Sequence, residues 1–296
     1  MNNRMKNTSK KLNHNCSICG SDMQFLFKAN NCYLDRCLNC GFTSVRKNQK
    51  ESFNYNESYF TNDKYRDEDT SNKEYKRRVL IINRHQVKGD SILEIGCAQG
   101  DFVSYASKDY NIYGCDISDE AIRIAFRKYP KIAGRFTACD ITDNDALIGS
   151  RIYGKYDAIC MWDTIEHVDN PLEFIRLSLE LLKSKGTIYL STPYIDALFA
   201  KITKSKWSFM TPPEHLSFLT KQSLKVIAKK LDLEILEWSS KGKWANLGFI
   251  IYKFNRVSHV KIPQGVQRMF ERKPMNHCGI YVPTKDIQYI VLRRKR

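Results

Sequence analysis

The chain has 296 residues, of which 42% are hydrophobic and 12% aromatic, and its formal net charge is +16. This composition suffices for one large domain with a core and a second, small one. No stretch approaches the roughly 20 apolar residues of a membrane-spanning helix, and the polar start of the chain carries no apolar signal segment. We therefore expect a cytoplasmic protein, whose ten cysteines are ligands or buried thiols before disulfides.

The charge is unevenly distributed along the chain. Basic residues outnumber acidic ones by 17 to 10 in residues 1–90 and by 20 to 6 in residues 201–296, whereas acidic residues lead by 16 to 11 in residues 91–200. A basic surface favours an anionic partner, such as a nucleotide-linked sugar, a phosphorylated or lipid-linked glycan, or RNA. A lysine-rich genome would explain the same excess without any partner.

Four cysteines near the N-terminus form two Cys-x-x-Cys pairs, each followed by a glycine and separated by 17 residues: Cys16 with Cys19, and Cys37 with Cys40. Four thiolates offer closed tetrahedral coordination, which indicates a structural Zn²⁺. We predict a zinc ribbon over residues 13–48, after a flexible basic tail over residues 1–12. Metal binding would supply its folding free energy, because so short a module buries too little surface alone.

Residues 49–88 join this ribbon to the rest of the chain. Tyr55, Tyr59 and Tyr65 lie in its aromatic first part. They are candidates for a lid over a substrate pocket, although surface aromatics of a linker are an equal interpretation. Residues from about 71 to 88 indicate a helix that leads into a sheet.

The stretch 91–100 organises everything that follows. Its apolar start indicates a strand buried on both faces, and Gly96 and Gly100 then allow a turn at which a ligand approaches backbone N–H groups. The glycines lack the Lys-Ser/Thr of a phosphate loop and the spacing of a dinucleotide site. Glu94 would repel a phosphate but suits a cation such as S-adenosylmethionine (SAM), and Asp116, at the end of the next strand-like run, can hold ribose hydroxyls.

Strand-like and helix-like segments alternate from residue 91 onward, which is typical of an α/β sandwich. Strands are predicted near 91–95, 112–116, 136–139, 157–161, 186–191, 233–238 and 287–292. Helices are predicted near 101–108, 118–129, 171–184 and 220–231. Ligands of such sheets bind beyond the carboxyl ends of the strands.

The spacing Glu94-x-Gly96-x-x-x-Gly100 with Asp116 resembles the first two motifs of class I SAM-dependent methyltransferases, and two later segments, 139–141 and 157–167, are similar to the third and fourth. This resemblance implies a Rossmann-like, seven-stranded methyltransferase sandwich over residues 89–296, preceded by the zinc ribbon. Ala98 stands where many members carry a third glycine. The resemblance implies that SAM is held by Glu94, Gly96, Cys97, Ala98, Gln99, Gly100, Asp116, Ile117, Asp140, Ile141, Trp162 and Asp163.

A basic insertion over about 194–219 follows the fifth predicted strand. Its segment Glu214-His215-Leu-Ser-Phe218 resembles that of methyltransferases from sugar, surface-polysaccharide and secondary-metabolite pathways, in which the matching Glu and His line the substrate site. Pro212 replaces the tyrosine that sugar C-methyltransferases of this kind carry. His215, Glu214 and His167 are the candidate catalytic residues, because imidazole accepts a proton near neutral pH. A structural role for either histidine stays open.

These features favour SAM-dependent O- or C-methylation of a nucleotide-linked or glycan-attached sugar. The alternative is an RNA methyltransferase that grips its substrate with the zinc ribbon and basic surface, although no Asn/Asp-Pro-Pro-Tyr/Phe base-methylating motif is present. A non-catalytic binding protein built on the same fold is a third interpretation. The acceptor atom and the oligomeric state are left open.

Overall fold

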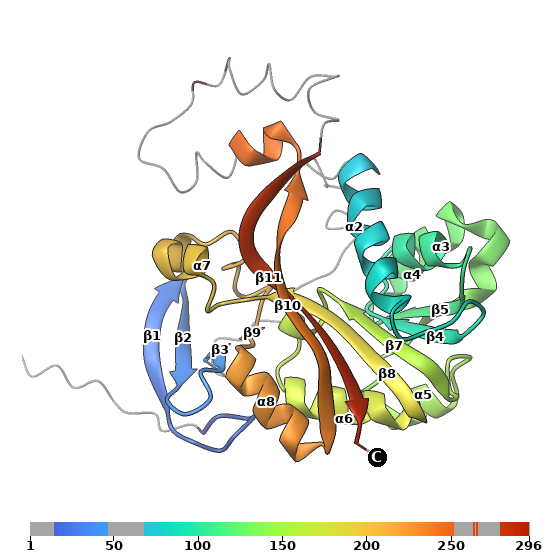
Figure 1. Ribbon diagram of the computed structural model, residues 1–296, viewed down its shortest axis with the longest axis horizontal. Coiled ribbons are helices and arrows are strands. Elements are labelled where there is room, and N and C mark those ends of the chain that lie inside the picture. Colours follow the sequence, from blue (N-terminus) through green and yellow to red (C-terminus); the bar gives the residue numbers. More distant parts are fainter. Residues whose placement is uncertain (1–14, 47–67, 252–262, 264, 266–278, 296) are drawn as a thin grey trace, which may run out of the picture.

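The computed structural model describes residues 15–46, 68–251, 263, 265 and 279–295. Within these ranges the chain forms a seven-stranded sheet flanked by helices and a smaller four-stranded sheet beside it (Figure 1). The three tyrosines predicted as a lid, and also Cys278, lie outside the described residues.

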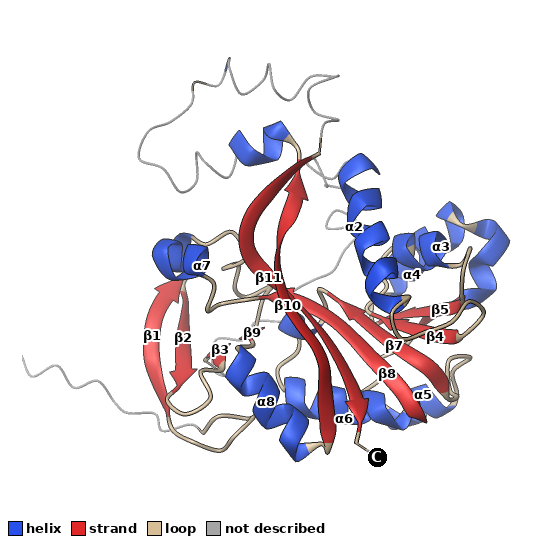
Figure 2. Cartoon of the chain, viewed as in Figure 1, coloured by secondary structure: helices blue, strands red, loops and turns tan. Residues whose placement is uncertain are grey.

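All seven strands of the large sheet were predicted from the sequence. Its order is β10-β11-β8-β7-β4-β5-β6. Five strands run parallel, while β11 is antiparallel to both of its neighbours (Figure 2). The strands span Ser91–Ile95 (β4), Asn111–Asp116 (β5), Phe136–Ala138 (β6), Tyr156–Trp162 (β7), Leu182–Pro193 (β8), Leu233–Ala245 (β10) and Ile280–Arg294 (β11).

Helices cover both faces of this sheet, so it is the middle layer of a sandwich. Side chains of α2, α3 and α4 pack on one face, and side chains of α5, α6 and α8 pack on the other. Alternate residues of one strand point to the two faces. Leu93 packs with α5, α6 and α8, whereas Ile92 packs with α2, α3 and α4. The helices span Glu68–Ile82 (α2), Asp101–Ala106 (α3), Asp119–Lys128 (α4), Asn144–Ile148 (α5), Pro171–Glu180 (α6), Leu198–Thr203 (α7) and Lys221–Lys230 (α8).

Helix starts follow the capping residues in the sequence. Ser118 accepts a hydrogen bond from the Ala121 N–H at the start of α4, and Thr220 forms a capping box with Ser223 at the start of α8. The predicted extent of the helix over 171–184 was wrong. It ends at Glu180, because the chain from Leu182 already belongs to β8, where Leu182 pairs with Tyr156.

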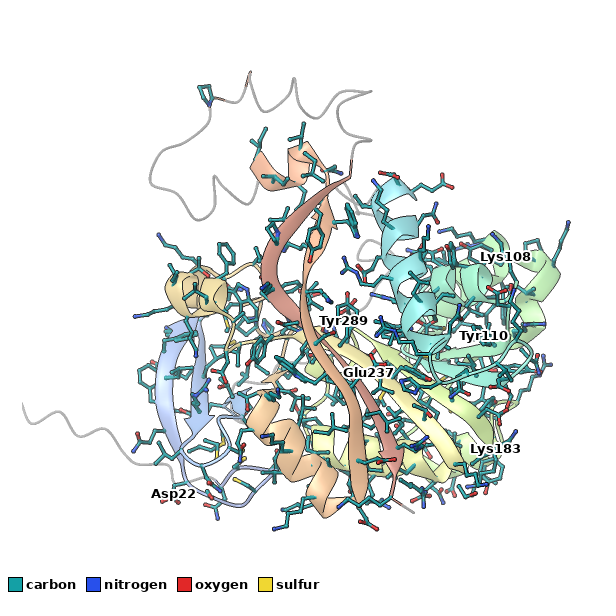
Figure 3. All side chains as sticks on the ribbon, viewed as in Figure 1. Asp22, Lys108, Tyr110, Lys183, Glu237 and Tyr289 are labelled. Atoms are coloured by element: carbon teal, nitrogen blue, oxygen red, sulfur yellow. The ribbon has the colours of Figure 1, made fainter. Side chains whose placement is uncertain are left out.

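Helix α2 is fixed along the last two strands of the sheet. Glu237 of β10, labelled in Figure 3, accepts hydrogen bonds from Arg84 at 2.6 Å and from His85 at 2.9 Å, just beyond the helix end. Arg77 in the helix donates to the Tyr289 hydroxyl at 3.1 Å and to the Gly242 carbonyl at 2.9 Å. These contacts hold α2 over the edge where β10 and β11 lie.

The small sheet joins the cysteine-containing segment to the large domain. Its order is β1-β2-β3-β9, with β1 at Met23–Ala29, β2 at Cys32–Cys37, β3 at Thr43–Val45 and β9 at Ser217–Phe218. Strand β9 comes from the basic insertion, and Thr43 pairs with Phe218. The sheet of the ribbon is therefore completed by a strand of the insertion.

Candidate SAM and acceptor site

A cavity of about 950 Å³ lies at the carboxyl ends of the parallel strands, where the sequence predicts ligand binding. Eleven of the twelve predicted SAM-binding residues line it, and Gly100 is the exception. Helix α2 and strands β10 and β11 contribute further walls. The cavity is therefore larger than the predicted SAM site.

The glycine turn after β4 has the conformation that its residues require. Gly96 and Gly100 have φ values of 77° and 78°, a region that L side chains rarely adopt. A Cβ on Gly96 would lie 2.5 Å from the Thr164 Oγ1, and one on Gly100 would lie 2.4 Å from the Phe136 ring. Ala98 has a φ of 46°, so the third position also takes the left-handed conformation, without glycine.

Asp116 is held in place by this turn. Its carboxylate accepts hydrogen bonds from the Ala98 N–H at 2.8 Å and from the Ser118 N–H at 2.9 Å. Burial raises the pKa of the Asp116 carboxyl, and the two N–H donors oppose that rise. The carboxylate thus lies fixed on the cavity wall, where the resemblance places the contact to ribose.

Glu94 is buried beside the turn, and its Oε2 atom has no hydrogen-bond partner among the described residues. Burial raises the pKa of this carboxyl to about 8, while the Arg78 guanidinium acts in the opposite direction. An unpartnered buried acceptor is costly, and a cationic ligand would satisfy it. The amino group of SAM fits this requirement.

Residues at the ends of β7 and β6, which flank β4 and β5 in the sheet, also line the cavity. Asp140 accepts hydrogen bonds from the Thr142 N–H at 2.9 Å and from its hydroxyl at 2.8 Å, so its backbone turn is fixed beside Ile141. Trp162 lies edge-on to Phe102 at 5.7 Å between ring centroids, and its indole N–H has no partner among the described residues.

Asp163 forms an ion pair that the sequence did not predict. Its carboxylate lies 2.5 Å from Arg78 of α2, and it also accepts a hydrogen bond from the Ser191 hydroxyl at 2.8 Å. The same guanidinium lies 5.3 Å from the Trp162 ring centroid. Arg78 therefore ties the leading helix to the loop after β7, beside the predicted SAM site.

The three predicted catalytic residues lie together, but only two of them line the cavity. His167 and Glu214 are on its wall, whereas His215 is 8% exposed and lies behind His167, at 4.8 Å between ring centroids. The Nδ1 of His167 donates to the Glu214 carbonyl at 3.0 Å, and the Nδ1 of His215 donates to the Phe209 carbonyl at 2.7 Å. Both rings therefore keep Nε2 as the basic nitrogen.

Burial keeps both imidazoles neutral. It lowers the pKa of His215 to about 4, with a further contribution from neighbouring His167, and it lowers the pKa of His167 as well. A neutral imidazole on a cavity wall can accept a proton. His167 meets this condition, and His215 supports the ring of His167 from behind.

A further part of the cavity wall contains residues that sequence reasoning missed. Lys243 and Trp244 of β10 and Tyr289 of β11 line it. The Lys243 ammonium donates to the Ser208 hydroxyl at 3.0 Å and lies 4.5 Å from the Phe209 ring centroid. Burial lowers the pKa of Lys243. The alternation of a strand could have placed Lys243 and Lys241 on one face, but no sequence signal distinguished Lys243.

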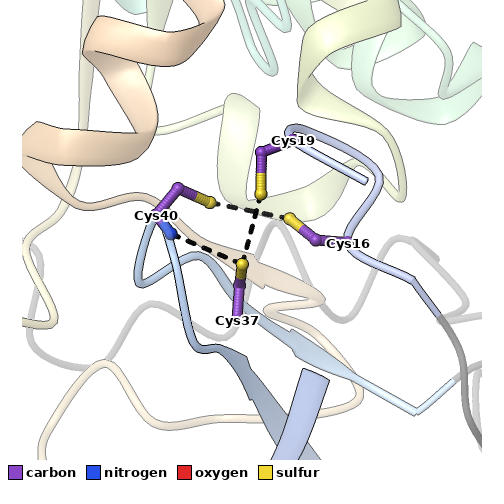
Figure 4. A group of neighbouring side chains, drawn as sticks. All are labelled: Cys16, Cys19, Cys37 and Cys40. Carbon is purple, nitrogen blue, oxygen red and sulfur yellow. Dashed lines mark hydrogen bonds between the residues drawn. The ribbon is translucent and has the colours of Figure 1, made fainter. Parts of the chain in front are cut away.

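The four predicted zinc ligands converge at the base of the ribbon (Figure 4). The sulfurs of Cys16 and Cys40 are 3.6 Å apart and those of Cys19 and Cys37 are 3.3 Å apart, and all four lie within 4.8 Å of one another. Sulfurs around a tetrahedral Zn²⁺ are about 3.8 Å apart, given Zn–S bonds of about 2.3 Å. The arrangement is therefore compatible with one Zn²⁺. The other described cysteines form no disulfide within the described part of the chain, and all are buried.

The ribbon is connected to the histidine pair through the insertion. The Val45 N–H of β3 donates to the Leu216 carbonyl at 2.9 Å, and the Leu216 N–H donates to the Glu166 carbonyl at 2.8 Å. The Thr220 hydroxyl donates to the carbonyl of the ligand Cys40 at 2.7 Å. The insertion segment that carries Glu214 and His215 is thus held on one side by the ribbon and on the other by the loop after β7.

Comparison with known proteins agrees with this geometry. Residues 66–237 match the model of a family described as a methyltransferase domain. Two ubiquinone biosynthesis O-methyltransferases are similar: that of Nitrosospira multiformis is 27% identical over 117 residues, which is 39% of this chain and 48% of that protein. That of Escherichia coli is 24% identical over 153 residues, which is 46% of this chain and 63% of that protein. The chain thus spans about half to two thirds of the length of these relatives.

Among solved structures, a SAM-dependent methyltransferase from Archaeoglobus fulgidus has a TM-score of 0.51 at 17% identity, covering 81% of this chain and 100% of that one. This likeness confirms the predicted fold. Among the described residues, no helix is long and apolar enough to cross a membrane.

Proposed function

The chain belongs to the methyltransferase-domain family that it matches over residues 66–237, and from this membership we propose that it methylates an anionic small-molecule acceptor with SAM. A nucleotide-linked or glycan-attached sugar in the cytoplasm is the acceptor class that we favour. The observation that carries the proposal is the buried Glu94 carboxylate, whose Oε2 has no hydrogen-bond partner within the described part of the chain, beside a glycine turn and a fixed Asp116 in one cavity. That set suits a ligand with a cationic group and ribose hydroxyls.

Each part of the cavity has a separate task in binding SAM. Glu94 would hold the amino group, Asp116 the ribose, and Asp140 with Ile141 and Trp162 the adenine side. SAM supplies a methyl group on a positively charged sulfur, so the protein mainly has to align the acceptor and, for a hydroxyl, remove its proton.

His167 is the base that this geometry favours, because it lines the cavity, is neutral and donates from Nδ1 to the Glu214 carbonyl, so that Nε2 is its basic nitrogen. The sequence alone put His215 first. The order is reversed in this proposal, because His215 lies behind the wall and its Nδ1 proton is engaged by Phe209. Glu214, whose carbonyl orients the His167 ring, would contact acceptor hydroxyls.

Lys243 supports an anionic acceptor. Its side chain lines the cavity, and its ammonium lies beside the Ser208 hydroxyl and two aromatic rings, where the reduced exposure to water strengthens attraction to a carboxylate or phosphate. Aromatic Trp244 and Tyr289 beside it suit the faces of a sugar or a nucleobase.

We further propose that one Zn²⁺ occupies the four-cysteine cluster and stabilises the insertion through β3 and β9. This position favours a small-molecule acceptor over RNA, because the task of the ribbon is then to hold the insertion segment that carries Glu214. The RNA alternative rests on the ribbon and on the basic surface implied by the net charge of +16. Short RNAs are therefore included among the acceptors that are tested.

The test is transfer of labelled methyl from SAM to nucleotide-linked sugars, phosphorylated glycans and short RNAs, with wild type and two variants. Lys243→Met should raise the KM for an anionic acceptor by about tenfold or more, the effect of losing a hydrogen bond to a charged group. Lys241→Met is the matched control, since Lys241 lies two residues away on the same strand and is exposed. Transfer only to RNA, or equal effects of the two variants, would contradict the proposal.

A further inference from the structure

The short helix α7 in the basic insertion carries an exposed apolar face. Leu198 is 74% exposed and Ile202 69% exposed, and residues four apart lie on the same side of a helix. Ala200, on the opposite side, is buried and packs with side chains of the ribbon strands and with Trp207. Helix α7 is thus held to the protein by one face while its larger side chains point outward.

Lysines surround this face. Lys201 lies within the helix, and Lys204 and Lys206 follow it in the next turn; all three are exposed. Strand β1, which carries the exposed Lys28, contacts this turn, and α7 lies beside the ends of β1 and β2 (Figure 1). We call Leu198, Ile202 and these four lysines the α7 patch.

Few carboxylates oppose this charge. Asp196 lies 2.8 Å from Arg36 and 3.7 Å from Lys201, so it is shared between two basic groups. Lys204 and Lys206 have no ion pair among the described residues. The patch therefore combines outward apolar side chains with an excess of positive charge.

We propose that the α7 patch docks the protein on an anionic lipid surface. Leu198 and Ile202 would enter the boundary between headgroups and acyl chains, and the lysines would contact the negative headgroups. Charge complementarity selects this occupant over a second copy of the chain, because two copies would bring the same lysines together. Binding would be peripheral and reversible, since the apolar face is short.

The chain that follows α7 contacts a residue of the cavity wall. After α7 the chain passes through buried Trp207 to Ser208 and Phe209, which contact Lys243 on the cavity wall. A surface bound at α7 would therefore lie next to the segment that contacts Lys243. The inference does not depend on which acceptor is methylated.

The test is co-sedimentation of the full chain with vesicles of phosphatidylcholine alone and of phosphatidylcholine mixed with phosphatidylglycerol. Wild type should bind the anionic vesicles preferentially and lose binding as salt is added. The double variant Leu198→Ser with Ile202→Ser should bind at least about tenfold more weakly. Replacing Lys201, Lys204 and Lys206 together by glutamine should weaken binding on the order of a hundredfold. The matched control is Val87→Ser with Ile148→Ser, two exposed apolar residues on other elements.

Retained binding by the control and its loss in the two patch variants would support the proposal, provided that circular dichroism shows all variants folded. Equal binding to neutral and anionic vesicles, or equal losses in control and patch variants, would overturn it. Size-exclusion chromatography adds a further outcome: a wild-type dimer that the double variant abolishes would show that the patch binds a second copy instead.

Discussion

Replacing Glu94 by glutamine should stabilise the protein at high pH while it weakens SAM binding. Burial raises the pKa of Glu94 from 4.5 to about 8 in the folded chain. Between those values the folded state keeps a proton that the unfolded chain has released, so wild type loses stability as pH rises from 4.5 through about 8. From about pH 6 to about pH 9 the loss amounts to about 3 kcal/mol for this one group.

Glutamine does not titrate, so the stability of Glu94→Gln relative to wild type should increase by that amount between the two pH values. Urea unfolding at both pH values measures it. Glu173→Gln is the control, because Glu173 also lines the cavity but Arg176 lowers the pKa of its carboxyl, so it is ionised at both. A stability difference that is the same at both pH values would refute the argument.

Calorimetry tests the functional half of the same prediction. Only the ionised carboxylate attracts a cation, so SAM affinity of wild type should rise by up to about tenfold per pH unit toward pH 8 and then level off. In Glu94→Gln the affinity should be low and nearly independent of pH. If the variant binds SAM as tightly as wild type at pH 8, Glu94 does not hold the amino group.

Three further outcomes are expected. Asp116→Ala should weaken SAM binding about tenfold or more, because a charge-assisted hydrogen bond is worth about 1.5–3 kcal/mol; unchanged affinity by calorimetry would remove Asp116 from the ribose site. Metal analysis should find about one zinc per chain, and Cys37→Ser should lose it together with several degrees of Tm, with a fully folded metal-free ribbon as the contrary result. His167→Ala should cut turnover about a hundredfold with little change in SAM affinity, the usual effect of losing a general base, whereas His215→Ala should mainly lower stability; turnover that survives in both variants would show that neither histidine removes the proton.

The linear order of motifs was sufficient for the fold, and it placed most of the predicted SAM-binding residues around one cavity. The predicted SAM-binding residues lie at or just beyond the ends of strands that the sequence shows as short apolar runs, so parallel pairing alone brings Glu94, Asp116 and Asp140 to one edge. Local rules also fixed the helix starts, since a capping side chain acts within three residues. The four cysteines predicted their own cluster, because their spacing suits one metal.

Tertiary structure decided what depends on contacts between distant segments. No local pattern could show that β3 pairs with β9, which ties the ribbon to the insertion, or that α2 places Arg78 against Asp163. The two histidines illustrate the limit best. Both follow a glutamate in the sequence and look equivalent, but the packing of the insertion against the loop after β7 exposes His167 to the cavity and buries His215 behind it. The sequence by itself determined which residues are chemically able to act, whereas burial and access, which arise only when remote segments pack, decided which of them can reach a substrate.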